Sequence, residues 1–123
     1  MKIMESAQNY LETIYMLQKK NGSVRSIDIA HELSYSKPSV SVAMKNFREA
    51  GYITVDESGE IKLTKKGEEI AVNMYERHTL IAKALMAIGV SEETAYKDSC
   101  KIEHDISDES FEKIKDFIDR NAK

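Results

Sequence analysis

The chain has 123 residues, 41% of them hydrophobic and 32% charged, with a formal net charge of −3. This composition excludes a disordered chain and fits one domain, or one small domain with an extension. A single cysteine excludes an intramolecular disulfide framework and favours a reducing compartment. No apolar run approaches the roughly 20 residues of a membrane span, and the N-terminus shows no signal-peptide pattern. We therefore expect a cytoplasmic protein without a membrane partner.

Charge is unevenly distributed between the two halves of the chain. Residues 1–66 carry ten Lys and Arg against eight Asp and Glu, whereas residues 90–123 carry six against ten. The two halves therefore suit different partners. The first half lacks the strong basicity that would by itself indicate nucleic-acid binding.

Hydrophobic periodicity predicts three helices in the first fifty residues. Residues 6–20 carry apolar side chains at helical spacing, namely Tyr10, Leu11, Ile14 and Leu17. Residues 26–33 predict a short helix with Ser26 as its N-cap. A turn leads to a third helix, which has Pro38 in its first turn and is closed by Gly51. The second and third helices form a helix-turn-helix by length and capping.

After Gly51 the period changes from helical to alternating. Residues 52–56 and 61–64 predict two strands joined by a glycine-containing turn, and a hairpin this small must pack on the helices. Three more helices are predicted after it: one over 65–88, one capped by Ser91 and one over 107–120, capped by Ser107. We therefore expect a mainly α fold, with a winged helix-turn-helix (three helices plus a two-stranded wing) at residues 1–70 and a helical dimerisation domain at residues 71–123.

The third predicted helix is the candidate DNA reader. Its outward and N-terminal positions are Ser36, Lys37, Pro38, Ser39, Ser41, Val42, Lys45 and Asn46. Serine hydroxyls and helix N-terminal amides bind phosphates, and Lys45 adds positive charge. Asn46 can pair with adenine, and Val42 can contact a thymine methyl group. A merely solvated face is the alternative, and winged helices also serve as protein-interaction modules.

The stretch CKIEHDIS at residues 100–107 places a thiol, a carboxylate and an imidazole on one helical face, from Cys100, Glu103 and His104. All three side chains ligate metals when deprotonated. His78 lies among apolar neighbours on the preceding long helix, and an antiparallel packing would bring it opposite. Convergence of four metal-capable groups favours a metal site over a partly buried cysteine beside a solvated Glu–His pair.

Other chemistry is poorly supported by the same residues. Cys100 and His104 have no third orienting group or oxyanion hole at an obvious spacing, and one cysteine with three scattered histidines matches no closed zinc-finger set. A hydrolytic metal site would need an open coordination position and a substrate pocket, which no motif indicates. We expect no enzymatic activity. A metal-independent winged-helix dimer that senses a small molecule, or oxidation through Cys100, is the alternative.

Six stretches carry a resemblance to a known family. They are NYLETIYML at 9–17, SKPSVS at 36–41, LTKKGEEIA at 63–71, RHTLIAKAL at 77–85, IGV at 88–90 and CKIEHDIS at 100–107. Together they resemble the DtxR/MntR-type metal-dependent transcriptional repressors, over essentially the whole chain. The resemblance implies a winged helix followed by a dimerisation domain, with Fe(II) or Mn(II) at their junction enabling operator binding. The chain is similar to the short manganese-regulator branch, which lacks an SH3-like domain.

The resemblance also implies a set of metal ligands. His78, Glu103 and His104 match ligands of both the iron and the manganese branches, and Glu12 matches a ligand of the manganese branch. Cys100 is the residue of the iron branch, at a position where manganese-type members have glutamate. The sequence is therefore a hybrid of the two branches.

Position 9 is a second departure, because Asn9 stands where the family has aspartate or methionine. Asn9 and Glu12, at i and i+3, still present two oxygens to one place. Ala82 and Tyr96 occupy positions that carry ligands of a second site in the iron branch. We therefore expect one complete metal site and at most a weak second one.

These implications predict a corepressor mechanism. A metal that joins the winged helix to the dimer core would fix two recognition helices about 34–36 Å apart, or a multiple of this, as successive major grooves require. A thiolate favours Fe(II), Co(II), Ni(II) or Zn(II) over Mn(II). We expect Fe(II) as the natural effector and Mn(II) next, with Co(II), Ni(II) or Zn(II) able to substitute. The expected partners are a double-stranded DNA operator and a second copy of the chain. The dimer would form through helices around 91–120, using the apolar face of Phe111, Ile114, Phe117 and Ile118.

Overall fold

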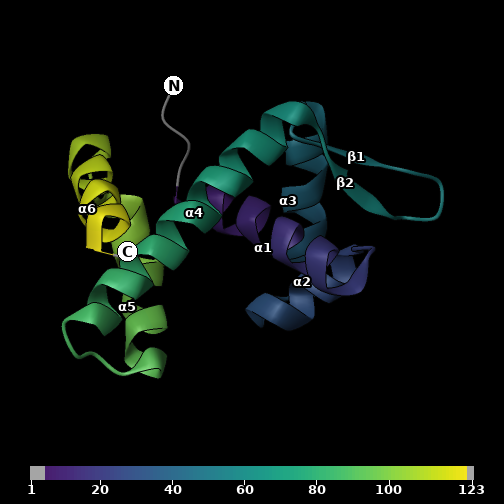
Figure 1. The fold of residues 1–123 in the computed structure, drawn as a ribbon. Coiled ribbons are helices and arrows are strands. Elements are labelled where there is room, and N and C mark those ends of the chain that lie inside the picture. The colour runs from purple at the N-terminus through teal and green to yellow at the C-terminus, as the bar shows by residue number, and fades with distance from the viewer. Residues whose placement is uncertain (1–4, 122–123) are drawn as a thin grey trace. The chain divides into compact units, whose positions relative to one another are not determined.

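The computed structural model describes residues 5–121 and divides the chain into two compact units, residues 1–72 and 73–123 (Figure 1). The elements are α1 (Glu5–Asn21), α2 (Ser26–Leu33), α3 (Lys37–Glu49), β1 (Ile53–Val55), β2 (Ile61–Leu63), α4 (Lys65–Ala87), α5 (Glu92–Asp105) and α6 (Asp108–Asn121). The predicted mainly α winged helix-turn-helix fold is confirmed, with each element within a few residues of its expected position.

The helix-turn-helix is built from local capping. Ser34 takes a left-handed conformation (φ 58°) at the end of α2, which turns the chain sharply toward α3. Ser36 caps α3, because its hydroxyl accepts the N–H of Ser39 at 3.3 Å. The N-cap of α2 is Arg25, one residue before the predicted Ser26, because the Asp28 carboxylate accepts the N–H of Arg25 at 2.9 Å.

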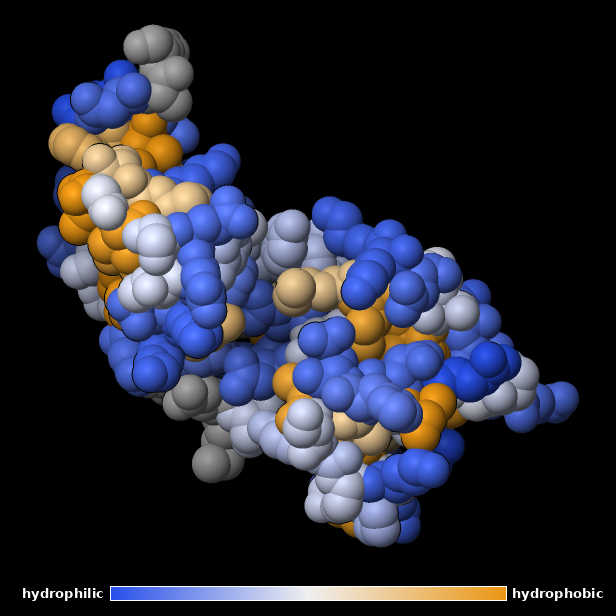
Figure 2. All heavy atoms as spheres, turned by 90° about the horizontal axis from the view of Figure 1, so that it is seen from below, coloured by the Kyte–Doolittle hydropathy of each residue, from blue (hydrophilic) through white to orange (hydrophobic). Residues whose placement is uncertain are grey.

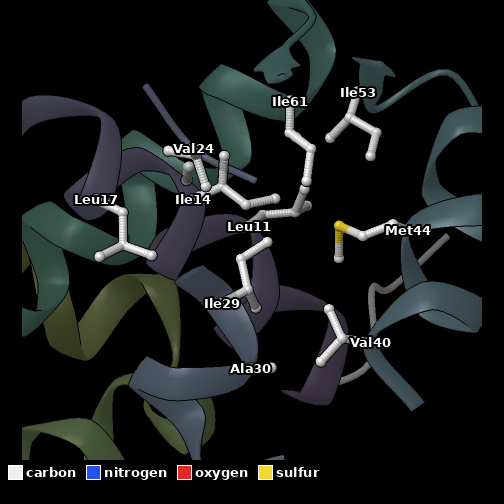
Figure 3. Close-up of a cluster of buried hydrophobic side chains, with 11 residues drawn as sticks. Leu11, Ile14, Leu17, Val24, Ile29, Ala30, Val40, Met44, Ile53 and Ile61 are labelled. Atoms are coloured by element: carbon white, nitrogen blue, oxygen red, sulfur yellow. The ribbon is translucent and has the colours of Figure 1, made fainter. Parts of the chain in front are cut away.

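The core of the first unit joins all three helices to the wing. The fully or almost fully buried side chains include Leu11 and Ile14 of α1, Ile29 of α2, Val40 and Met44 of α3, Ile53 of β1 and Ile61 of β2 (Figure 3). Burying each large aliphatic side chain contributes about 1.5–3 kcal/mol. This burial explains why the exposed face of α3 keeps a defined orientation within the unit.

The wing is a short antiparallel hairpin in which Thr54 pairs with Lys62. Its second strand is tied to the segment between α1 and α2 by the Ile61 N–H, which donates to the Val24 carbonyl at 2.7 Å. The Asp56 carboxylate accepts the Ser58 hydroxyl at 2.7 Å and the Glu60 N–H at 3.0 Å. These hydrogen bonds hold the pKa of Asp56 below its ordinary value and fix the turn at the wing tip.

Capping predicted from the sequence also starts the last two helices. Ser91 accepts the N–H of Thr94 at 3.4 Å at the start of α5, and Ser107 accepts the N–H of Ser110 at 3.1 Å at the start of α6.

Among the described residues, none of the helices combines the length and apolar character that a membrane span requires.

The apolar face predicted on α6 is only partly exposed, which corrects one expectation. Phe111 is 3% exposed and packs inside its own unit, so it does not belong to a free face. Phe117 on the same helix is 56% exposed, and Ile88 beyond α4 is 78% exposed. Apolar side chains gather on the outer surface at the left of Figure 2. The second unit therefore keeps apolar surface beyond what its own core uses.

Candidate metal centre and DNA-facing helix

His78 of α4 meets α5 through its Nδ1 atom. This atom lies 3.1 Å from Oε2 of Glu103, 3.3 Å from Oγ of Ser99 and 3.5 Å from Sγ of Cys100. The other oxygen of Glu103, Oε1, lies 3.3 Å from Nε2 of His104. Each of the four ligands predicted in the second unit therefore contacts at least one of the others.

Burial makes this cluster chemically unusual. Glu103 is 1% exposed, and His78 and His104 are each 9% exposed. A carboxylate removed from water needs a cation or strong hydrogen bonds to offset its lost hydration. Here its two oxygens face two imidazoles, which can act as ligands only when their facing nitrogens are unprotonated. A divalent cation bound by these atoms would offset the charge of the buried carboxylate.

Three neighbouring pairs of donor atoms lie at separations that two ligands of one metal ion can have. Two donors about 2.0–2.3 Å from a common transition metal, at angles of about 90–110°, lie about 2.8–3.8 Å apart. The pairs His78–Glu103, Glu103–His104 and Cys100–His78 have separations of 3.1, 3.3 and 3.5 Å, and each falls within this range. Imidazole, thiolate and carboxylate together suit Fe(II), Co(II), Ni(II) or Zn(II), and the residues therefore fit a transition metal.

Cys100 differs from its three companions because it is exposed, whereas they are buried. Its thiol therefore lies at the rim of the centre.

Two further residues of α5 contact His78 and were not predicted as contacts. Ser99 is fully buried and brings its hydroxyl toward Nδ1, and the Tyr96 ring packs against the imidazole with centroids 5.4 Å apart. Tyr96 thus packs against a predicted ligand.

Asn9 and Glu12 belong to α1 in the first unit. They lie one turn apart on that helix, with Asn9 half-buried and Glu12 6% exposed. Their assignment as ligands stays a prediction.

The residues predicted to read DNA lie on the exposed side of α3 and its N-terminus: Ser36, Lys37, Pro38, Ser39, Ser41, Val42, Lys45 and Asn46 are all exposed. Val40 and Met44 on the opposite side enter the core. The Ser36 hydroxyl donates to the Ser39 hydroxyl at 2.8 Å while it caps the helix, so it is already engaged. Val42 is 61% exposed, which a buried contact with DNA would account for.

Tyr35, in the turn before α3, was missed from the sequence. It is 44% exposed and stacks edge-on against Tyr10 of α1, with ring centroids 5.6 Å apart. Tyr10 contacts Phe47 of α3 in the same way, also at 5.6 Å. These rings connect α1 to the turn before α3, through Tyr35, and to α3 itself, through Phe47. Hydrophobic periodicity does not identify residues in turns. The one sequence signal for Tyr35 is that an aromatic residue directly precedes the N-cap of a helix.

Two family models match the chain in succession. Residues 2–60 match the model described as iron dependent repressor, N-terminal DNA binding domain, and residues 64–123 match iron dependent repressor, metal binding and dimerisation domain. The chain is 34% identical to the HTH-type transcriptional regulator MntR of Lysinibacillus sphaericus over 113 residues, covering 92% of the chain and 81% of that protein. MntR of Bacillus subtilis gives the same identity over 92% of the chain and 80% of that protein.

Solved structures show the same likeness. The manganese regulator SloR matches with a TM-score of 0.79 and 28% identity over 92% of the chain. A manganese-dependent transcriptional repressor in complex with manganese matches with a TM-score of 0.79 and 26% identity over 88% of the chain. The chain spans 53% and 50% of these two solved chains, respectively.

Proposed function

The chain belongs to the iron-dependent repressor family of metal-dependent transcriptional regulators, and from this premise we propose that a divalent transition metal is its corepressor, bound by His78, Cys100, Glu103 and His104. The observation that carries the proposal is the buried Glu103 carboxylate between two imidazoles, with a thiol at the rim. The metal would supply positive charge and join ligands from different helices. The protein supplies the donors and the dry surroundings.

Fe(II) is the proposed natural effector, with Mn(II) next. The two solved relatives described above are named for manganese, whereas this chain offers a thiol beside His78. Thiolates favour softer metals, and Mn(II) is lowest in the affinity order for divalent first-row metals. Co(II), Ni(II) or Zn(II) would occupy the same donors in a test tube.

Asn9 and Glu12 are proposed as additional ligands from α1. A metal that bound them together with the residues of α4 and α5 would join the DNA-binding unit to the dimerisation unit. Such a link would restrict the separation of the two recognition helices in a dimer to the roughly 34–36 Å that adjacent major grooves require, or a multiple of it. If the separation of the recognition helices is fixed before DNA binds, less conformational entropy is lost on binding and operator affinity rises.

The proposed partners are a double-stranded operator and a second copy of the chain. The exposed polar face of α3 would contact DNA, and the apolar surface around Phe117 would face the second copy.

Selection from a random duplex library tests this function without assuming an operator sequence. The full chain, freed of metal, would be incubated with the library under anaerobic conditions with Fe(II), with Mn(II) or with a chelator. We expect a two-fold symmetric sequence to be enriched with metal and not with chelator. Equal enrichment in the chelator arm would favour a metal-independent regulator, and no enrichment in any arm would contradict DNA recognition.

A further inference from the structure

Arg77 directly precedes His78 on α4 and is 6% exposed. Its Nη1 donates to the Glu103 carbonyl at 3.3 Å and to the Ile106 carbonyl at 2.9 Å. Two consecutive residues of α4 therefore hold the same residue of α5. His78 faces the Glu103 side chain, and Arg77 holds its main chain.

The same guanidinium also reaches α6. Its Nη2 forms an ion pair with the Asp108 carboxylate in the first turn of that helix. The guanidinium carbon lies 5.1 Å from the centre of the Phe111 ring, as a cation–π contact requires. One side chain thus connects the metal-ligand segment of α4, the last turn of α5 and the start of α6.

Packing alone does not account for an arginine at this position. Burying a guanidinium is costly, and apolar side chains of similar volume join helices at least as well. Among the described residues, the Nε atom of Arg77 is buried without a hydrogen-bond partner, which adds to that cost. What arginine provides, and an apolar residue does not, is a pair of donors directed at the main chain of Glu103 and Ile106.

We propose that Arg77 is a positioning residue of the metal centre. By fixing the main chain of Glu103, it holds that carboxylate between the two imidazoles, and through Asp108 and Phe111 it links the position of the centre to α6. The inference rests on the proposed function, since it assigns a role toward the same metal. Metal binding is therefore expected to reduce backbone motion at the start of α6 as well as at the ligand residues.

The test compares the full wild-type chain with Arg77→Lys, which keeps the charge but replaces the planar guanidinium by a single ammonium. Co(II) serves as the probe, because its visible spectrum reports ligand geometry. We expect Co(II) affinity to fall about 10–100-fold, as for other residues that orient metal ligands. The spectrum at saturating Co(II) should also change. In the metal-free variant, hydrogen exchange should be faster at the amides of Ile106 and Phe111, which donate to Ile102 and Ser107.

Glu76→Gln is the matched control. The Glu76 carboxylate accepts from Lys115 at 2.8 Å and so also joins α4 to α6, but these two residues lie outside α5. It should keep wild-type Co(II) affinity and spectrum. Thermal unfolding monitors whether each variant is folded at the assay temperature, since a folded variant cannot lose affinity tenfold through global stability alone.

If Arg77→Lys does not fold, Asp108→Asn gives the answer, because the Asp108 side chain is 93% exposed and its removal spares the core. It should weaken Co(II) binding several-fold and change the spectrum. If a folded Arg77→Lys variant keeps wild-type Co(II) affinity and spectrum, the inference about Arg77 is overturned and the proposed function is untouched. The same result in Asp108→Asn has the same meaning where Arg77→Lys does not fold. A wild-type chain that binds no Co(II) would overturn the proposed function itself.

Discussion

Nδ1 of His78 lies 3.1 Å from Oε2 of Glu103, although 25 residues separate the two in the chain. The contact exists because α4 and α5 pack against each other within one unit, and it is buried on both sides. Since a buried carboxylate and an imidazole both bind transition metals, this pair forms the centre of the proposed site.

Replacing the thiol should change metal preference. Cys100→Glu exchanges a soft ligand for a hard, charged oxygen, so activation by Mn(II) should improve relative to Fe(II). Cys100→Ser is the matched control, since it removes the thiol without adding a carboxylate, and should weaken activation by both metals. Operator binding titrated with each metal under anaerobic conditions provides the measurement. An unchanged preference in Cys100→Glu would mean that Cys100 is not a ligand.

Two neighbouring positions of α3 should affect DNA binding differently. Lys45→Ala should weaken binding to all sequences and make the plot of log affinity against log salt shallower by about 0.9 if this lysine neutralises one phosphate. Val42→Ala should alter the ranking of operator variants more than overall affinity, because a methyl contact reads a base. Binding to a panel of duplexes at several salt concentrations separates the effects. Identical behaviour of the two variants would contradict these roles.

Two phenylalanines of α6 should separate dimerisation from folding. Phe117→Asp places a charge on exposed apolar surface, so it should shift the protein toward monomer while the second unit keeps its fold. Phe111→Ala removes a buried ring and should cost about 3–5 kcal/mol of stability. Sedimentation over a range of concentrations and thermal unfolding measure the two effects. A Phe117→Asp variant that sediments as the wild type does would exclude this surface as an interface.

The wing turn should respond to acid through Asp56. Its hydrogen bonds lower its pKa in the folded chain below the ordinary value of 3.8. The stabilisation is therefore fully present above about pH 3.8 and is lost as the pH falls through the lower, folded-state pKa. Asp56→Asn should lower the urea midpoint at pH 7, and this difference should shrink below about pH 3.8. Glu57→Gln, one residue on, controls for the loss of charge, and an equal effect there would argue against the specific hydrogen bonds.

Local signals predicted most of the fold. Ser91 and Ser107 cap their helices as expected, because each cap depends on a hydroxyl and an amide three residues away. The cap at Ser26 was wrong for an equally local reason: the Asp28 side chain selects the main chain of Arg25 instead. Patterning alone does not choose between two adjacent caps.

Side-chain contacts between helices were harder to predict. His78, Cys100, Glu103 and His104 were predicted as ligands because their residue types bind metals, and this assignment stays a prediction. The contacts of Ser99 with His78 and of Arg77 with Glu103 were not predicted, since a serine and an arginine on a helix make such contacts only through tertiary packing. The burial of Phe111 was missed for the same reason, since its contact with the Arg77 guanidinium joins residues of two different helices.

Operator binding with and without metal tests the central claim most directly. The metal-free full chain would be titrated into the fluorescently labelled duplex enriched by selection, with Fe(II) or chelator, and anisotropy recorded anaerobically. We expect Fe(II) to tighten binding by at least tenfold for the wild type and for His31→Ala, whose imidazole is exposed on α2, and to have no effect on His104→Ala. Equal affinity of the wild type with Fe(II) and with chelator would contradict a metal corepressor.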